Sequence, residues 1–101
     1  MIATTKLKRI VIIFQDNLEE RLAKDLKALG TKGYTVDKVR GSGLDGARTS
    51  EWEGENIRMV TVCAPEVAYK ILEHLQSHYF EQYAGIVYMS DVEVVRGERF
   101  V

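Results

Sequence analysis

The stretch "GYTVDKVRGSGLDGARTSEWEGENIRMVTVCA", residues 33–64, decides the fold. Its two ends, residues 33–41 and 56–64, carry the alternation and the β-branched side chains that are typical of strands. No helical pattern lies between them, so these two strands follow each other directly in the chain. A polar segment rich in glycine, residues 41–55, joins them.

This connecting segment is fifteen residues long, whereas hairpin loops usually have about two to five. Loops longer than roughly 12–15 residues in compact domains are usually functional or disordered. One interpretation is a hairpin tip whose glycines only serve turns. The other is that the segment is the working part of the molecule.

A strand and a helix are predicted before this stretch. Residues 7–14, "LKRIVIIF", are apolar at nearly every position, which favours a central strand that is covered on both faces, or one that is half-covered and lies at a subunit contact. Residues 16–29 carry leucines at helical spacing, with Asp16 as the expected N-cap and Gly30 as the C-terminal stop. The leucines of this stripe are Leu18, Leu22, Leu26 and Leu29.

A second helix and a fourth strand are predicted after it. Pro65 suits the first helical position of residues 65–80, and Val67, Ile71, Leu75 and Tyr79 form the apolar stripe. Residues 84–95 read as a strand, followed by a short tail. The order β-α-β-β-α-β predicts an α+β, ferredoxin-like fold with two helices on one face of a four-stranded antiparallel sheet, in one domain over residues 1–101.

Composition and net charge argue against two classes of function. Charged residues make up 29% of the 101, and the formal net charge is −1. A binder of nucleic acid or of a membrane surface needs an excess of Lys and Arg, so neither is expected. The single cysteine, Cys63, lies in an apolar run and is expected to be buried, with a redox or catalytic thiol as the alternative. With no signal peptide visible, we expect a cytoplasmic protein.

Catalytic and metal sites are not expected. His74 and His78 share a helix face, but no further ligands accompany them at a metal-binding spacing. The paired carboxylates Glu19–Glu20 and Glu51/Glu53 lack a nucleophile beside them. A small ferredoxin-like enzyme or a nucleic-acid-binding module is the alternative function.

Two segments resemble one family. "KGYTVDKVRGSG", residues 32–43, is similar to the strand that leads into the T-loop of the PII signalling superfamily. "YFEQYAGIVYMSDVEVVRGERF", residues 79–100, resembles the end of the PII-like proteins of carbon metabolism, which are linked to bicarbonate transport or carboxysomes. The resemblance covers about residues 7–100, and residues 41–55 take the place of the T-loop.

The resemblance implies a non-enzymatic homotrimer with an adenine nucleotide, ADP or AMP first and also ATP or cAMP, in each cleft between subunits, sometimes with bicarbonate. It implies a partner such as a bicarbonate transporter or a carboxysome-associated protein. The residues matching the family's nucleotide site are Gly33, Thr35, Gly41, Ser42, Gly43, Arg96, Gly97 and Arg99.

Elementary chemistry adds two residues to this set and names two more for other ligands. A nucleotide needs an apolar slot for its base, which Tyr34 could help to form, and donors for its phosphates, near which Arg40 adds charge. Arg48 is the candidate for bicarbonate. Trp52, an aromatic residue on a polar loop, is the candidate contact for a partner protein.

Overall fold

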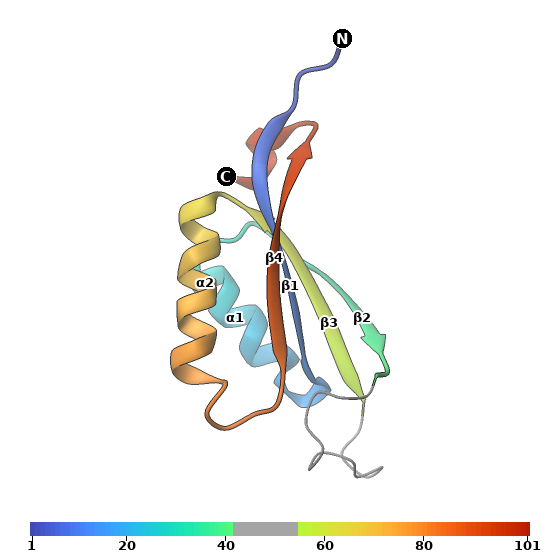
Figure 1. Cartoon of the computed structure of the whole chain (residues 1–101), viewed down its shortest axis with the longest axis vertical. Coiled ribbons are helices and arrows are strands. Elements are labelled where there is room, and N and C mark those ends of the chain that lie inside the picture. Colours follow the sequence, from blue (N-terminus) through green and yellow to red (C-terminus); the bar gives the residue numbers. More distant parts are fainter. Residues whose placement is uncertain (42–54) are drawn as a thin grey trace.

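A computed structural model describes residues 1–41 and 55–101. Its elements follow the predicted order (Figure 1). The strands are β1 (Thr5–Gln15), β2 (Thr35–Val39), β3 (Asn56–Cys63) and β4 (Ile86–Val94), and the helices are α1 (Glu19–Leu29) and α2 (Pro65–His78). Short 3-10 turns, η1 (Asp16–Leu18) and η3 (Gly97–Phe100), precede α1 and end the chain.

The four strands form one antiparallel sheet in the order β2-β3-β1-β4. Both helices lie on the same face of this sheet (Figure 1). The predicted ferredoxin-like arrangement is therefore confirmed. β1 and β3 are the inner strands, which explains why "RIVIIF" is apolar at nearly every position.

The core lies between the helices and the sheet. The predicted stripes are confirmed: Leu18, Leu22 and Leu26 are buried on the first helical segment, and Ile71, Leu75 and Tyr79 on the second. Alternate residues of β1 and β3 meet them, because side chains of a strand point to opposite faces in turn. These strand residues are Ile10, Ile12, Phe14, Ile57, Met59 and Cys63.

The helix boundaries follow mostly from local chemistry. Gly30 caps α1 with a left-handed φ of 117°, and Pro65 opens α2, both as predicted. The prediction that Asp16 caps the first helix is wrong. Asp16 instead begins η1, and its backbone N–H donates to the carbonyl of Glu55 at 2.8 Å. Because the extra turn moves the start of α1 to Glu19, Leu18 occupies the N-cap position without a side-chain hydrogen bond.

The face of the sheet opposite the helices is also rich in apolar residues. Strand register places Val60, Val11 and Tyr88 in one row across it, and Ile13 and Ile86 in the next. Val11 is fully buried although it is not part of the core cluster, whereas Tyr88 is 49% exposed. This surface, the helix-free face, thus carries these apolar side chains, with the pair of Arg58 and Asp37 in the second row, and the described chain leaves it uncovered in part.

The prediction for Cys63 concerns burial. Cys63 is fully buried, and burial, with a smaller contribution from Glu66, raises the pKa of its thiol. Because the thiolate is the reactive form, the packing role expected for Cys63 fits its surroundings. None of the helices in the described part of the chain has the length and apolarity needed to span a membrane.

Candidate functional site

The end of β2 forms the first part of the predicted site. Arg40 and Gly41 line a groove of about 270 Å³ together with Arg58 from β3 and the apolar Ile13 and Ile86. Apart from its chain neighbours, no described residue has an atom within 4 Å of a Cβ added at Gly41. The groove therefore combines a cationic side, an apolar side and an open stretch of backbone.

Arg58 in this groove is held by Asp37 across the β2–β3 register. Its Nε donates to Asp37 Oδ1 at 3.1 Å and its Nη2 to Oδ2 at 2.6 Å, a bidentate pair. This hydrogen bonding lowers the pKa of the Asp37 carboxyl and raises the pKa of the Arg58 guanidinium. Because Asp37 balances Arg58, Arg40 supplies the charge that remains for an anion here.

The start of β2 forms the second part. Gly33, Tyr34 and Thr35 are exposed, and Tyr34 is 46% exposed despite its size. The Gly33 carbonyl accepts a hydrogen bond from the Thr61 hydroxyl at 2.7 Å, which fixes the backbone. A Cβ at Gly33 would meet no described atom within 4 Å. Neither packing nor backbone conformation therefore accounts for a glycine at this position.

The C-terminal turn forms the third part. Arg96 has a left-handed backbone, with φ 65° and ψ 45°, and Arg96 and Arg99 are both exposed. Gly97 differs, because it is buried and an added Cβ would lie 2.8 Å from Thr5 Cγ2 and closer still to Thr5 Cβ. Gly97 thus lets η3 pack against the start of β1, and its surroundings give it a structural role of its own.

These parts do not meet within one chain. The end of β2 is level with Gln15, because Val39 pairs with Asn56 and Asn56 with Gln15, whereas the chain reaches Arg96 just after Val94 has paired with Thr5. At about 3.3 Å per residue, the ten steps from Thr5 to Gln15 span about 33 Å. Figure 1 shows η3 and the end of β2 at opposite ends of the sheet.

Four predicted residues cannot be placed in this geometry. Ser42, Gly43, Arg48 and Trp52 lie outside the described residues. Their assignments to the nucleotide, to bicarbonate and to a partner protein stay predictions.

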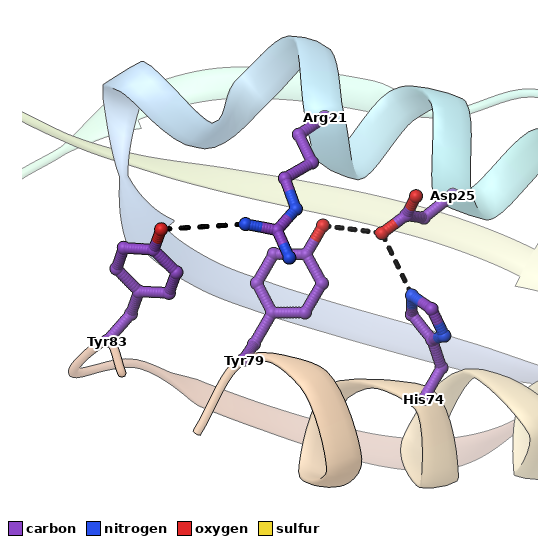
Figure 2. A network of polar contacts seen from close by, with 5 residues as sticks. All are labelled: Arg21, Asp25, His74, Tyr79 and Tyr83. Atoms are coloured by element: carbon purple, nitrogen blue, oxygen red, sulfur yellow. Dashed lines mark hydrogen bonds and ion pairs between the residues drawn. The ribbon is translucent and has the colours of Figure 1, made fainter. Parts of the chain in front are cut away.

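Sequence reasoning missed a polar cluster between the helices (Figure 2). Asp25 of α1 accepts two hydrogen bonds at Oδ2, from the Tyr79 hydroxyl at 2.5 Å and from His74 Nε2 at 2.9 Å. The Arg21 guanidinium lies 4.4 Å from the centre of the Tyr79 ring, and its Nη1 donates to the Tyr83 hydroxyl at 3.5 Å. Arg21 and Asp25 are four residues apart on α1, a spacing that places them on one face.

The electrostatics of this cluster are those of a structural contact. Burial alone would raise the pKa of Asp25, but the hydrogen bonds from Tyr79 and His74 outweigh it, so the carboxyl titrates below its ordinary range. Burial, and then the Asp25 carboxylate, raise the pKa of Tyr79. The cluster therefore holds α1 to the end of α2.

His74 and His78 also make contacts of a structural kind. Their rings lie 4.6 Å apart, and His74 is engaged by Asp25. Across residues 1–41 and 55–101, no three His, Cys, Asp or Glu side chains gather as metal ligands would.

Comparisons with known proteins give the chain its relatives. A protein of Thermus thermophilus assigned to the PII-like signalling proteins is 46% identical over the whole of both chains, with a TM-score of 0.86. CPII from Thiomonas intermedia K12, solved with ADP and bicarbonate, is 27% identical over the whole of both chains, also with a TM-score of 0.86. CPII solved with ADP, AMP and bicarbonate is 27% identical over 99% of this chain and 98% of that one, with a TM-score of 0.84.

A family model confirms the resemblance found in the sequence. The model for nitrogen regulatory protein P-II matches residues 7–99, which include every element except the ends of β1 and η3. The chain therefore belongs to the PII family.

Proposed function

We propose that this protein is a non-enzymatic PII-like regulator that binds an adenine nucleotide, ADP or AMP, between the subunits of a homotrimer. The relative CPII, similar along its whole length, has been solved with ADP, AMP and bicarbonate. The observation that carries the proposal is the position of Gly33 and Gly41. Both match the family's nucleotide-binding segments, and described atoms give no packing reason for a glycine at either.

The separation of the candidate residues supports a site between subunits. Arg40 and Gly41 lie at one end of β1 and Arg96 and Arg99 at the other, about 33 Å away along the strand. A nucleotide is too short to touch both groups of one chain. A second copy of the chain must bring its C-terminal arginines to the Gly41 groove of the first.

The helix-free face supplies the surface for such an assembly. Its partly exposed apolar side chains, with Val60 and Ile86, would be covered when three sheets pack together around an axis. Burial of these side chains would offset the small core of a 101-residue chain. This explanation also gives the half-exposed Tyr88 a packing role.

The regulatory output is proposed for the loop. Nucleotide binding at Gly41–Gly43 would change the conformation of residues 44–55, and ordering a segment is a recognised switch device. Trp52 would then contact a partner that controls inorganic-carbon uptake or carboxysome-linked metabolism, in the cytoplasm. Bicarbonate would bind beside the nucleotide, with Arg48 as the candidate contact.

Mixed trimers test both the site and its location. Gly41→Asp places a carboxylate at one half of the site, and the double variant Arg96→Gln/Arg99→Gln removes the cations of the other half. We expect neither variant alone to bind ADP in calorimetry. When the two are refolded together in equal amounts, roughly a quarter of the clefts should combine two intact halves and bind ADP again, because assembly in a ring is random.

Two controls make the outcome decisive. Lys70→Gln lies on the exposed face of α2, away from both halves, and should bind ADP like the unmodified chain. Sedimentation should give trimer mass for every variant. If AMP, ADP, ATP and cAMP all fail to bind the unmodified chain at millimolar concentration, with or without bicarbonate, the proposal that it binds an adenine nucleotide is refuted. If a monomer binds ADP, the proposal that the site lies between subunits is refuted.

A further inference from the structure

A second groove lies away from the Gly41 end of the sheet. It runs between the C-terminal half of α1 and the segment that leads into β2, and has a volume of about 670 Å³. Lys24 and Lys27 come from the helix, and Lys32, Gly33 and Tyr34 come from the segment. We call it the lysine groove.

The positive charge of the lysine groove is not balanced by its surroundings. None of its lining residues is acidic. Within residues 1–41 and 55–101, Lys24, Lys27 and Lys32 form no ion pair, whereas Lys8 pairs with Asp91 and Lys38 with Glu55. Lys27 lies in the last turn of α1, where a cation favours the helix dipole. That explanation does not extend to Lys24 or to Lys32, which follows the helix.

The wall of the groove is rigid and open. The Gly33 carbonyl is held by Thr61, and no described atom would obstruct a side chain at Gly33. Tyr34 presents nearly half of its surface beside the lysines. An anion could thus approach the backbone at Gly33 closely while ammonium groups surround it from the helix and from the segment.

We propose that the lysine groove binds phosphate groups. Three ammonium groups favour a multiply charged anion over a monoanion such as bicarbonate, because each added negative charge interacts with all three. The phosphates could belong to a free polyphosphate anion or to the end of a bound nucleotide. The second source rests on the proposed function, because Gly33 and Tyr34 are also candidate nucleotide residues. It would place the phosphates at the start of β2, whereas the proposed function places them at the Gly41 groove.

Inorganic pyrophosphate is the probe for the groove itself. We expect it to shift the backbone amide signals of Gly33 and Tyr34 of the unmodified protein in NMR at low salt. Lys24→Gln/Lys32→Gln should weaken this binding about tenfold, since each lost cation contributes a modest amount. Lys27 is kept so that α1 retains its C-terminal charge. The control Lys6→Gln/Lys70→Gln has the same net charge and should bind pyrophosphate within about twofold of the unmodified chain.

An ADP titration of the same variants distinguishes the two sources. If pyrophosphate competes with ADP and Lys24→Gln/Lys32→Gln weakens both, the groove holds the phosphates of the nucleotide. If the variant loses pyrophosphate alone, the groove is a separate site for a free anion.

The proposal fails if pyrophosphate leaves Gly33 and Tyr34 unshifted, or if both double variants bind it equally well. ADP binding in that case would leave the proposed function intact. Conversely, pyrophosphate binding by a chain that ignores every adenine nucleotide would keep the lysine groove and refute the proposed function.

Discussion

The glycines of this chain differ in what requires them. Gly85 and Gly97 are needed by the chain itself, because an added Cβ would lie closer than 3.0 Å to Phe14 or to Thr5. A Cβ added at Gly33 or Gly41 would meet no described atom within 4 Å apart from the adjacent residues of the chain. The fold itself requires the first two glycines, whereas nothing in the described chain requires a glycine at the other two positions. The proposed ligand approaches at these other two.

Gly85→Ala should have the largest effect on stability. The new Cβ would lie 2.8 Å from the carbonyl oxygen of Ile13 and closer to the Phe14 ring, which stacks on Phe80. Since neither backbone nor core ring can move freely, we expect a loss of about 3 kcal/mol in the free energy of unfolding, measured by urea titration. An unchanged urea midpoint would show that the Gly85 contact is not required.

Gly97→Ala should cost less, about 2 kcal/mol. The clash is with the side chain of Thr5, at the first residue of β1, where the strand end can shift. The same urea titration measures the loss. Thr5→Gly combined with Gly97→Ala removes the obstructing atoms, and the double variant should therefore recover part of the stability. Additive losses in the double variant would contradict the contact.

Asp25→Asn tests the polar cluster between α1 and α2, whose contacts all lie within one chain. Replacing the carboxylate weakens its bonds to Tyr79 and His74, and we expect a loss of about 1–2 kcal/mol at pH 7. The folded-state pKa of Asp25 is below its usual 3.8, so its contribution exists above that pH and disappears as the pH falls. The folded-state pKa of Tyr79 is above its usual 10.0, so its contribution is lost as the pH rises past 10.

Stability measured against pH checks this assignment. The unmodified chain should lose stability at both extremes, and Asp25→Asn should flatten both slopes. Tyr79→Phe should remove the alkaline contribution of Tyr79 and reduce the acid slope in part, because the Tyr79 hydroxyl is one of the two donors that lower the pKa of Asp25. It serves as the matched variant. If the free energy of unfolding depends on pH in the same way in all three proteins, the Asp25 cluster does not cause the pH dependence of stability.

Gly33→Ala and Gly41→Ala should have the smallest effects on stability. Because a Cβ at either position would meet no described atom within 4 Å apart from the adjacent residues, the free energy of unfolding should change by no more than about 0.5 kcal/mol. Calorimetry should nevertheless show weaker ADP binding, because each methyl group enters the proposed ligand path. A large loss of stability in either variant would show that the fold itself requires that glycine, as it requires Gly85 and Gly97.

Much of the fold was predictable from local patterns. The stripe from Leu18 to Leu26, the stop at Gly30 and the alternation from Ile57 to Cys63 each have a periodicity or a backbone preference that sequence displays directly. Asp16 was misjudged because η1 adds a turn before the helix. Its N–H bonds to Glu55, a residue distant in sequence, and local spacing cannot reveal such a contact.

The candidate site was less accessible to sequence reasoning. The pairing of Asp25 with His74 and Tyr79 depends on how α1 and α2 pack, and these residues lie 49 and 54 positions apart. The lysine groove was missed because Lys24 and Lys32 belong to different elements. Gly97 was grouped with the nucleotide residues on resemblance alone, whereas its contact with Thr5 appears only when the chain ends are folded together.

The burial of Cys63 has a practical consequence for spectroscopy. The chain has one thiol, it is fully buried, and its raised pKa keeps it protonated at neutral pH. Maleimides and thiol-specific nitroxide labels react with exposed thiolates, so the native protein should not react with them. A cysteine introduced at an exposed position such as Lys70 would carry the label alone, without removal of the native residue from the core.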